Sequence, residues 1–212
     1  MNNRTIRVRG SARVSAAPDW VEIHFDLESR EYKYSDCIKK LGYKTETLRS
    51  ELVAVNLEKD SLKTADFSVE TDFEWINKRH VFRGYKAHHN MVVAFPFDKD
   101  YLNKVLAVLG TTASEASFRV IFKIKDPEPF RQQAIADAVK NCREKAEVLA
   151  QAAGVALGEL IEIDYSWSEV RFESRMELRS MVMEDTMESP AYDIEPDDIN
   201  ISDSVTAIWA IA

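Results

Sequence analysis

The sequence has few of the residues that mark metal sites, disulfide scaffolds or low-complexity chains. Its 212 residues include two cysteines, six glycines and six prolines. Glycine and proline are too scarce for a collagen-like or low-complexity chain. The cysteines, Cys37 and Cys142, have neither CxxC nor metal-ligand spacing. We expect both to be buried free thiols, and a disulfide between them is the alternative.

The sequence also lacks a basic excess and long apolar runs. Its 36 acidic and 28 basic side chains give a formal net charge of −8, whereas nucleic-acid binders usually carry a basic excess or stripe. No run approaches the roughly 18 consecutive apolar residues of a membrane span. The opening residues, MNNRTIRVRG, contain no apolar signal core. We therefore expect a soluble, cytoplasmic protein that neither binds nucleic acid nor spans a membrane.

Two alternating segments stand at the start of the chain. Apolar and charged residues alternate over residues 6–14 and again over 21–28. An antiparallel pairing that sets Arg13 opposite Glu22 satisfies the charges on one face and packs the apolar side chains on the other. We therefore predict that these two strands form a hairpin.

The stretch from Asp126 to Gly154 predicts one long helix. Asp126 and Pro127 are typical of a helix start, and Gly154 of a helix end. Small and apolar residues recur at steps of three and four: Phe130, Ala134, Ala138, Cys142, Ala146, Leu149 and Ala153. At 1.5 Å per residue the helix is about 40 Å long. We expect its small residues to let the main sheet approach closely, so that the helix backs that sheet.

The remaining periodic segments predict two more helices and five more strands. The helices are expected over residues 35–56 and 98–110, and the strands over 67–75, 81–97, 118–124, 160–165 and 205–211. The last strand has two apolar faces, so we expect it to be central or covered on both sides. This order of elements predicts an α+β fold of antiparallel sheets with packed helices.

Between residues 166 and 204 the periodicity weakens, and acidic residues and methionines become frequent. We interpret this stretch as a variable, acidic, Met-rich surface excursion. The pair Met181 and Met183 is compatible with binding of a soft metal such as Cu(I), or with oxidation to sulfoxide. Exposed loop methionines without a ligand role explain the pair better.

The sequence offers four histidines as candidate metal ligands: His24, His80, His88 and His89. Neighbouring strand residues point to opposite faces, so His88 and His89 cannot readily share one ion. We expect ordinary surface and core histidines, with His89 hydrogen-bonded on an apolar face. No phosphate loop, dinucleotide fingerprint or nucleophile elbow occurs, although triads that assemble only in space stay open. We predict no catalytic residue, no cofactor and no metal site.

One candidate surface patch lies on the predicted second hairpin. It consists of Lys78, Arg79, Arg83, Lys86 and His88, and aromatic residues surround it in sequence. Basic residues interleaved with aromatic ones can hold a phosphate or single-stranded nucleic acid. On an acidic protein, a solvated hairpin is the better interpretation.

Several segments, in this order, resemble the SIMPL-domain proteins, a YggE-like group often called oxidative stress defence proteins. They are IRVRGSARVSAAPDWVEIHFDLE, LKTADFSVETDFEW, FRGYKAHHNMVV, DPEPFRQQAIADAVKNCREKAEVLAQAAGVALGELIEI and ISDSVTAIWAI. The resemblance implies a single two-lobed domain over residues 1–212. An inner lobe of residues 62–125 is then inserted into an outer lobe of residues 1–61 and 126–212.

The resemblance implies no established enzyme activity. Bacterial relatives are associated with oxidative-stress tolerance, some periplasmic relatives form large homo-oligomers, and a mammalian relative binds a kinase. We therefore expect a non-enzymatic interaction or scaffold protein that self-associates and has protein partners. The alternative is a small-ligand binder or enzyme with a pocket between the two lobes.

Overall fold

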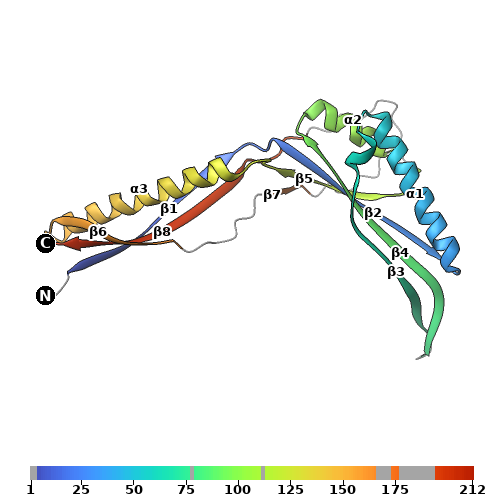
Figure 1. The fold of residues 1–212 in the computed structure, drawn as a ribbon, viewed down its shortest axis with the longest axis horizontal. Coiled ribbons are helices and arrows are strands. Elements are labelled where there is room, and N and C mark those ends of the chain that lie inside the picture. Colours follow the sequence, from blue (N-terminus) through green and yellow to red (C-terminus); the bar gives the residue numbers. More distant parts are fainter. Residues whose placement is uncertain (1–3, 77–78, 111–112, 166–172, 177–193) are drawn as a thin grey trace. The chain divides into compact units, whose positions relative to one another are not determined.

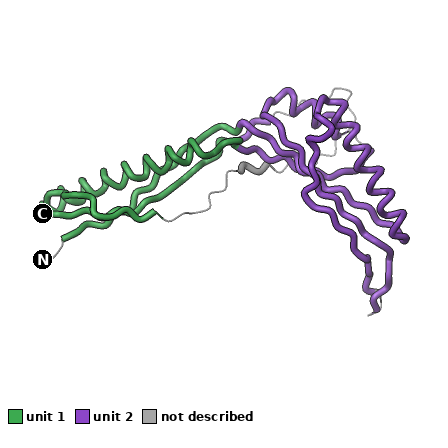
Figure 2. The backbone as a smooth tube through the Cα atoms, viewed as in Figure 1, with its two compact units in different colours: residues 1–18, 124–174, 197–212 green, residues 19–123, 175–196 purple. Residues whose placement is uncertain are grey.

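The computed structural model describes residues 4–76, 79–110, 113–165, 173–176 and 194–212, which form two compact units (Figures 1 and 2). Unit 1 consists of residues 1–18, 124–174 and 197–212, and unit 2 of residues 19–123 and 175–196. In each unit, helices pack on an antiparallel sheet. The predicted α+β class is therefore confirmed.

Unit 1 is built from a three-stranded sheet and one long helix. The strand order is β1 (Thr5–Ala16), β8 (Ile199–Ile211) and β6 (Leu157–Asp164), and α3 (Glu128–Ala152) packs on β1 and β8. The last strand is therefore central, as its apolar faces predicted. Its alternate residues are buried: Ile199, Ile201, Asp203, Val205, Ala207 and Trp209.

Small residues let α3 lie almost directly on β1. The helix buries Ala134, Ala138, Cys142, Ala146 and Ala150. A Cβ atom placed on Gly10 would lie 2.2 Å from the Ala138 carbonyl oxygen and 2.5 Å from the Cys142 nitrogen. The Cys142 thiol donates to the Val8 carbonyl at 3.2 Å. The long helix thus backs the sheet made by the two chain ends, and Cys37 and Cys142 are both free and buried, as predicted.

The predicted hairpin of the first two strands is wrong. β1 pairs with β8, whereas β2 (Trp20–Glu31) belongs to the sheet of unit 2. Arg13 lies opposite Ser202, and Glu22 lies opposite Ala94 and Ile121. The alternating charges did not specify the partner, because each strand finds a better apolar neighbour elsewhere. The first boundary between the units falls between Pro18 and Asp19.

Unit 2 contains a five-stranded sheet in the order β3-β4-β2-β5-β7. Besides β2, the strands of this sheet are β3 (Lys63–Ile76), β4 (Arg79–Pro96), β5 (Ser117–Lys123) and β7 (Glu173–Met176). The helical elements are α1 (Tyr34–Ala54), η1 (Lys59–Ser61) and α2 (Lys99–Gly110). The inner face of β4 buries Ala87, Met91, Val93 and Phe95. These residues, the alternate residues of β2, and buried residues of α1, α2 and β5 form the main core.

Most of the predicted acidic excursion, including Met181 and Met183, lies outside the described residues. Its described parts belong to the fold. β7 joins the sheet of unit 2, and Ile194 is buried in the core of that unit. The excursion was predicted to extend to residue 204, but β8 already begins at Ile199 because Ile199 and Ile201 point into the core.

Candidate functional site

The predicted basic patch is only partly brought together. Lys78 lies outside the described residues. Arg79 is exposed at the start of β4. Arg83 lies further along the β3–β4 hairpin, where its guanidinium pairs with Glu74 at 2.6 Å. The guanidinium of Arg83 is therefore already neutralised within the hairpin.

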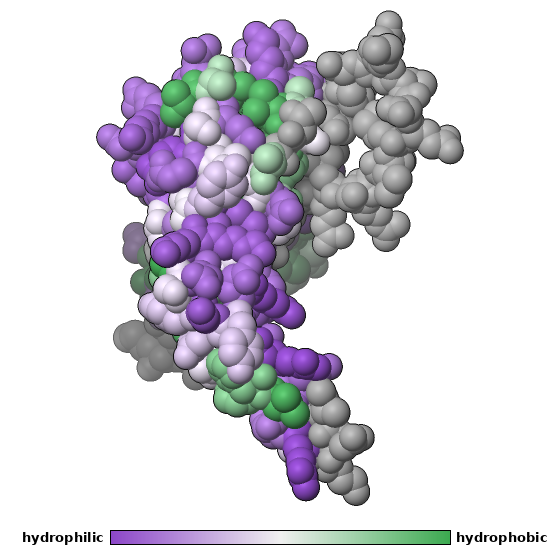
Figure 3. Space-filling model, turned by 90° about the vertical axis from the view of Figure 1, so that its right-hand side faces the viewer, coloured by the Kyte–Doolittle hydropathy of each residue, from purple (hydrophilic) through white to green (hydrophobic). Residues whose placement is uncertain are grey.

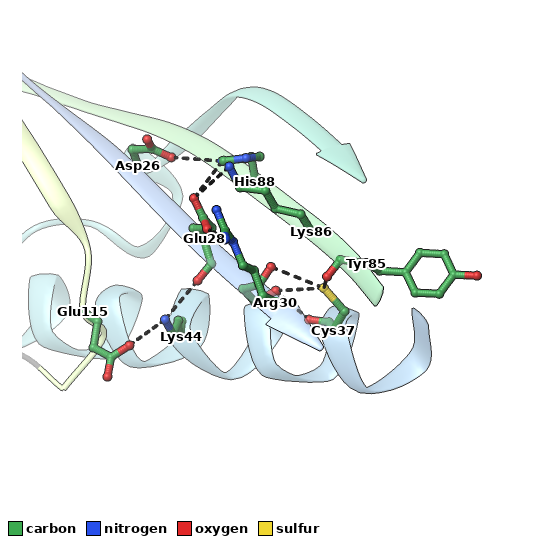
Figure 4. Close-up of polar contacts among 10 residues, drawn as sticks. Asp26, Glu28, Arg30, Cys37, Lys44, Tyr85, Lys86, His88 and Glu115 are labelled. Atoms are coloured by element: carbon green, nitrogen blue, oxygen red, sulfur yellow. Dashed lines mark hydrogen bonds and ion pairs between the residues drawn. The ribbon is translucent and has the colours of Figure 1, made fainter. Parts of the chain in front are cut away.

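Of the other two members of the patch, His88 lies opposite Glu28 of β2 and Lys86 lies opposite Arg30 (Figure 4). Glu28 accepts from Arg30 Nε at 2.7 Å and pairs with Lys86 Nζ at 3.2 Å. His88 Nδ1 lies 3.8 Å from Asp26 and 3.9 Å from Glu28. Partial burial opposes ionisation of Glu28, but hydrogen bonds from Lys86 and Arg30 outweigh burial and lower its pKa. Glu28 is thus a paired carboxylate and not a proton donor at neutral pH.

Lys44 lies beside this cluster, at the side of β2 that has no described strand neighbour beyond Asp26. β5 begins at Ser117, opposite Asp26. In the described part of the chain, β2 therefore continues past Asp26 without a strand neighbour on that side. Lys44 Nζ donates to the Glu28 carbonyl at 2.9 Å and pairs with Glu115 at 2.7 Å (Figure 4). The pocket here, about 360 Å³, is lined by three acids, three bases and two serines: Asp26, Glu28, Glu115, Arg30, Lys40, Lys44, Ser29 and Ser117. These charges balance, so the pocket has no net attraction for an ion.

Ser29 and Cys37 are neighbouring buried residues of nucleophilic type. The Ser29 hydroxyl donates to the Cys37 carbonyl at 2.9 Å, and the Cys37 thiol donates to the Tyr85 carbonyl at 3.3 Å. These bonds tie β2, α1 and β4 together (Figure 4). Within the described chain, neither side chain bonds to a histidine or a carboxylate, the base that activates such a nucleophile. Both side chains instead hold backbone carbonyls of neighbouring elements.

His89 is the hydrogen-bonded core histidine that the sequence predicted. The Thr45 hydroxyl donates to the Leu41 carbonyl at 2.9 Å, so it accepts from His89 Nδ1, 3.1 Å away. His89 Nε2 then accepts from the Thr64 hydroxyl at 2.9 Å. Burial, and next the charge of Arg49, lower the pKa of His89. The ring is satisfied in its neutral form.

The lowered pKa of His89 makes folding stability depend on pH. An unfolded histidine has a pKa of about 6.5, so the unfolded chain binds the proton more tightly than the folded one. The stabilisation is complete above that pH and is lost as the pH falls through the folded pKa. We expect the free energy of unfolding to fall between about pH 7 and 5, and to fall less in His89→Gln. Urea unfolding at several pH values measures how steeply the free energy of unfolding changes with pH in the unchanged protein and in His89→Gln. An equal dependence on pH in both proteins would contradict a lowered pKa of His89.

The other histidines do not assemble a metal site. His24 Nε2 lies 3.0 Å from Glu22, and His80 stacks near Trp75 at 4.0 Å between ring centroids. The described residues contain no cluster of three or more His, Cys, Asp or Glu side chains arranged to hold a metal ion.

The edge strand β6 of unit 1 exposes apolar side chains. Leu160, Ile161 and Ile163 are 47%, 49% and 48% exposed. α3 lies over β1 and β8 and leaves a groove of about 370 Å³ beside β6. The groove is lined mainly by Val139, Leu157, Leu160, Ile163, Ala207 and Trp209. The sequence predicted this strand but gave no indication that it forms an edge.

The opposite edge of the same sheet is protected. Asn141 of α3 accepts from the Ser11 backbone N–H at 3.2 Å, and Lys145 donates to the Arg9 carbonyl at 3.3 Å. Helix side chains therefore occupy backbone groups of β1 that would otherwise pair with another strand. Charged side chains such as Arg7 and Arg9 further discourage such pairing. In the described residues α3 makes no such hydrogen bond to β6, whose own protection consists of acidic residues and two β-bulges against β8.

Comparison with known proteins identifies the family. The model of the SIMPL family, described as a protein of unknown function (DUF541), matches residues 6–209. This chain belongs to the SIMPL family. The chain is 23% identical over 219 residues to the uncharacterized protein YggE of Edwardsiella ictaluri (strain 93-146), covering 96% of this chain and 85% of that protein.

This SIMPL chain was also aligned with the solved structure of an uncharacterized conserved protein from Listeria innocua. The alignment covers 99% of this chain and 93% of that chain, at 8% identity and a TM-score of 0.19. No helix in the described part of the SIMPL chain is long and apolar enough to cross a membrane.

Proposed function

We propose that this SIMPL-family chain is a non-enzymatic interaction or scaffold protein that self-associates through β6. The contrast between the two edges of unit 1 carries the proposal. α3 caps the β1 edge at Arg9 and Ser11, whereas β6 offers three apolar side chains that are each about half exposed. An uncapped apolar edge strand is a template for a strand of another chain.

A twofold contact between two β6 strands suits the order of residues along this edge. β6 has a β-bulge against β8 at Ile161. In a pairing centred on that residue, Glu159 would face Ile163 of the second copy and Glu162 would face Leu160. No two carboxylates are then directly opposed, which would be unfavourable. Twofold dimers are the commonest closed assemblies, and the contact uses the same surface on each copy.

The polar clusters support binding over catalysis. Glu28 and Lys44 are held in ion pairs, and the neutral ring of His89 is saturated by two threonines. Ser29 and Cys37 contact backbone carbonyls instead of a general base. The link to oxidative-stress tolerance that the family resemblance implies is part of this proposal. In this proposal, the protein contributes to oxidative-stress tolerance by assembling and not by catalysing a reaction.

Light scattering of the purified chain at micromolar concentration tests the proposal. We expect the mass to rise with concentration from the 24.3 kDa of a monomer to at least twice that value. A particle that stays monomeric over the whole range would refute self-association.

A further inference from the structure

A chain of aromatic rings covers one face of the β3–β4 hairpin in unit 2. Trp75 lies opposite His80 and Phe73 opposite Phe82, so the four rings share one face. β2 ends opposite Tyr85, so β4 beyond that residue pairs with β3 alone, and α1 begins only at Tyr34. α1 reaches the hairpin here through the ring of Tyr34, which contacts that of Tyr85.

The rings touch one another edge to face. Phe82 lies 5.7 Å from Phe73, 5.6 Å from Tyr85 and 5.5 Å from Tyr32, measured between ring centroids. Tyr85 in turn lies 5.6 Å from Tyr34. We call this surface the aromatic platform: Tyr32, Tyr34, Phe73, Trp75, His80, Phe82 and Tyr85. Figure 3 shows a few pale and green residues among purple ones in the lower part of the view.

The exposed area is too small for a stable dimer but sufficient for a peptide. Trp75 is 67% exposed, Tyr32 69%, Tyr34 54% and Phe73 49%. At about 200 Å² per aromatic side chain, these four expose roughly 500 Å². A stable interface buries about 800 Å² per partner. An apolar patch of this size on a monomer is often functional.

The charges around the platform disfavour an anionic occupant. Glu74 and Arg83 pair with each other at 2.6 Å, and Lys86 is held by Glu28 at 3.2 Å. A phosphate-bearing surface or a nucleic acid would have to displace these ion pairs on a protein of net charge −8. A neutral ligand that stacks on rings would leave them intact.

A proline-rich segment meets these requirements. Its polyproline II helix forms without internal hydrogen bonds and loses little entropy on binding, and it docks on surfaces lined with aromatic rings. We propose that the aromatic platform binds a proline-rich segment of a partner protein. This surface lies in unit 2 and is separate from the β6 edge.

Fluorescence polarisation with labelled decaproline tests the platform on the full chain. We expect saturable binding to decaproline and none to an alternating Gly-Ser peptide of equal length. Trp75→Ala should weaken binding about tenfold or more, which corresponds to about 1.4 kcal/mol. Tyr43→Ala is the matched control, because Tyr43 is 70% exposed on α1 and stands outside the platform. The affinity of Tyr43→Ala for decaproline should equal that of the unchanged chain. Circular dichroism is used to check that each variant folds.

Absence of saturable binding, equal binding of the Gly-Ser peptide, or equal losses in Trp75→Ala and Tyr43→Ala would overturn the proposal. If Trp75→Ala lowered the particle mass measured by light scattering, the platform would bind a second copy of this chain instead of a proline-rich segment, and the proposal would also be overturned. Binding to anionic vesicles or single-stranded DNA but not to decaproline would do the same. The Ile161→Lys variant, altered only in β6, should bind decaproline like the unchanged chain, so failure of self-association leaves this test intact.

Discussion

Gly10→Ala is expected to lower the free energy of unfolding by about 3 kcal/mol, at the upper end of the cost of overpacking a core. The new Cβ atom would meet the Ala138 carbonyl oxygen at 2.2 Å and the Cys142 Cα atom at 2.8 Å. Both are backbone atoms of α3, so no side-chain rotation relieves the clash. The helix would have to move away from β1 and would weaken its contacts along the small-residue stripe. Urea unfolding followed by circular dichroism measures the loss.

Gly42→Ala is the matched control for this change. Gly42 lies inside α1, and a Cβ atom there would meet nothing within 4 Å. Alanine at an open helix position is favoured over glycine by up to about 1 kcal/mol. The two substitutions, which add the same methyl group, are therefore expected to shift stability in opposite directions. Equal stabilities of Gly10→Ala and the unchanged protein would contradict the close approach of α3.

Ile161→Lys is expected to weaken self-association about 100-fold or more, which is about 2.7 kcal/mol. Ile161 is 49% exposed on β6, so the monomer loses little packing. In the proposed contact, two lysines would face each other across the twofold axis, with the cost of like charges added to desolvation. Light scattering should then show a monomer at concentrations where the unchanged protein assembles.

Val148→Lys provides the comparison for that variant. Val148 is 65% exposed on α3 and lies outside β6 and its groove. Substitution there adds the same charge at a similar exposure, and we expect assembly to persist. Equal loss of assembly in both variants would indicate a general charge effect and would count against the β6 contact.

The element types were predictable from sequence because they depend on which side chains are buried. The step of three and four in α3 and the alternation along β8 each report burial within one element. Strand partners depend on the whole chain, and here the prediction failed. Arg13 and Glu22 offered a plausible local pair, yet β1 gained more by packing between β8 and α3. Charge pairing at exposed positions is too weak to select a partner.

The candidate surfaces were predictable only in part. His89 was correctly expected to be hydrogen-bonded, because a histidine on an apolar strand face needs polar partners. The basic patch was only partly assembled, since Glu28 reaches Lys86 from a strand distant in sequence. The exposed edge was missed. The apolar residues Leu160, Ile161 and Ile163 are as compatible with a buried central strand as with an exposed edge strand. Only the position of β6 at the end of the sheet distinguishes these two cases.

Hydrogen–deuterium exchange of the unchanged protein at rising concentration tests the central claim most directly. Pairing of β6 with a second copy predicts that amides within Leu157–Asp164 become more protected as the particle mass increases, while α1 exchanges as before. If the mass rises without added protection in β6, or if β6 exchange and mass are both independent of concentration, self-association through this edge is contradicted.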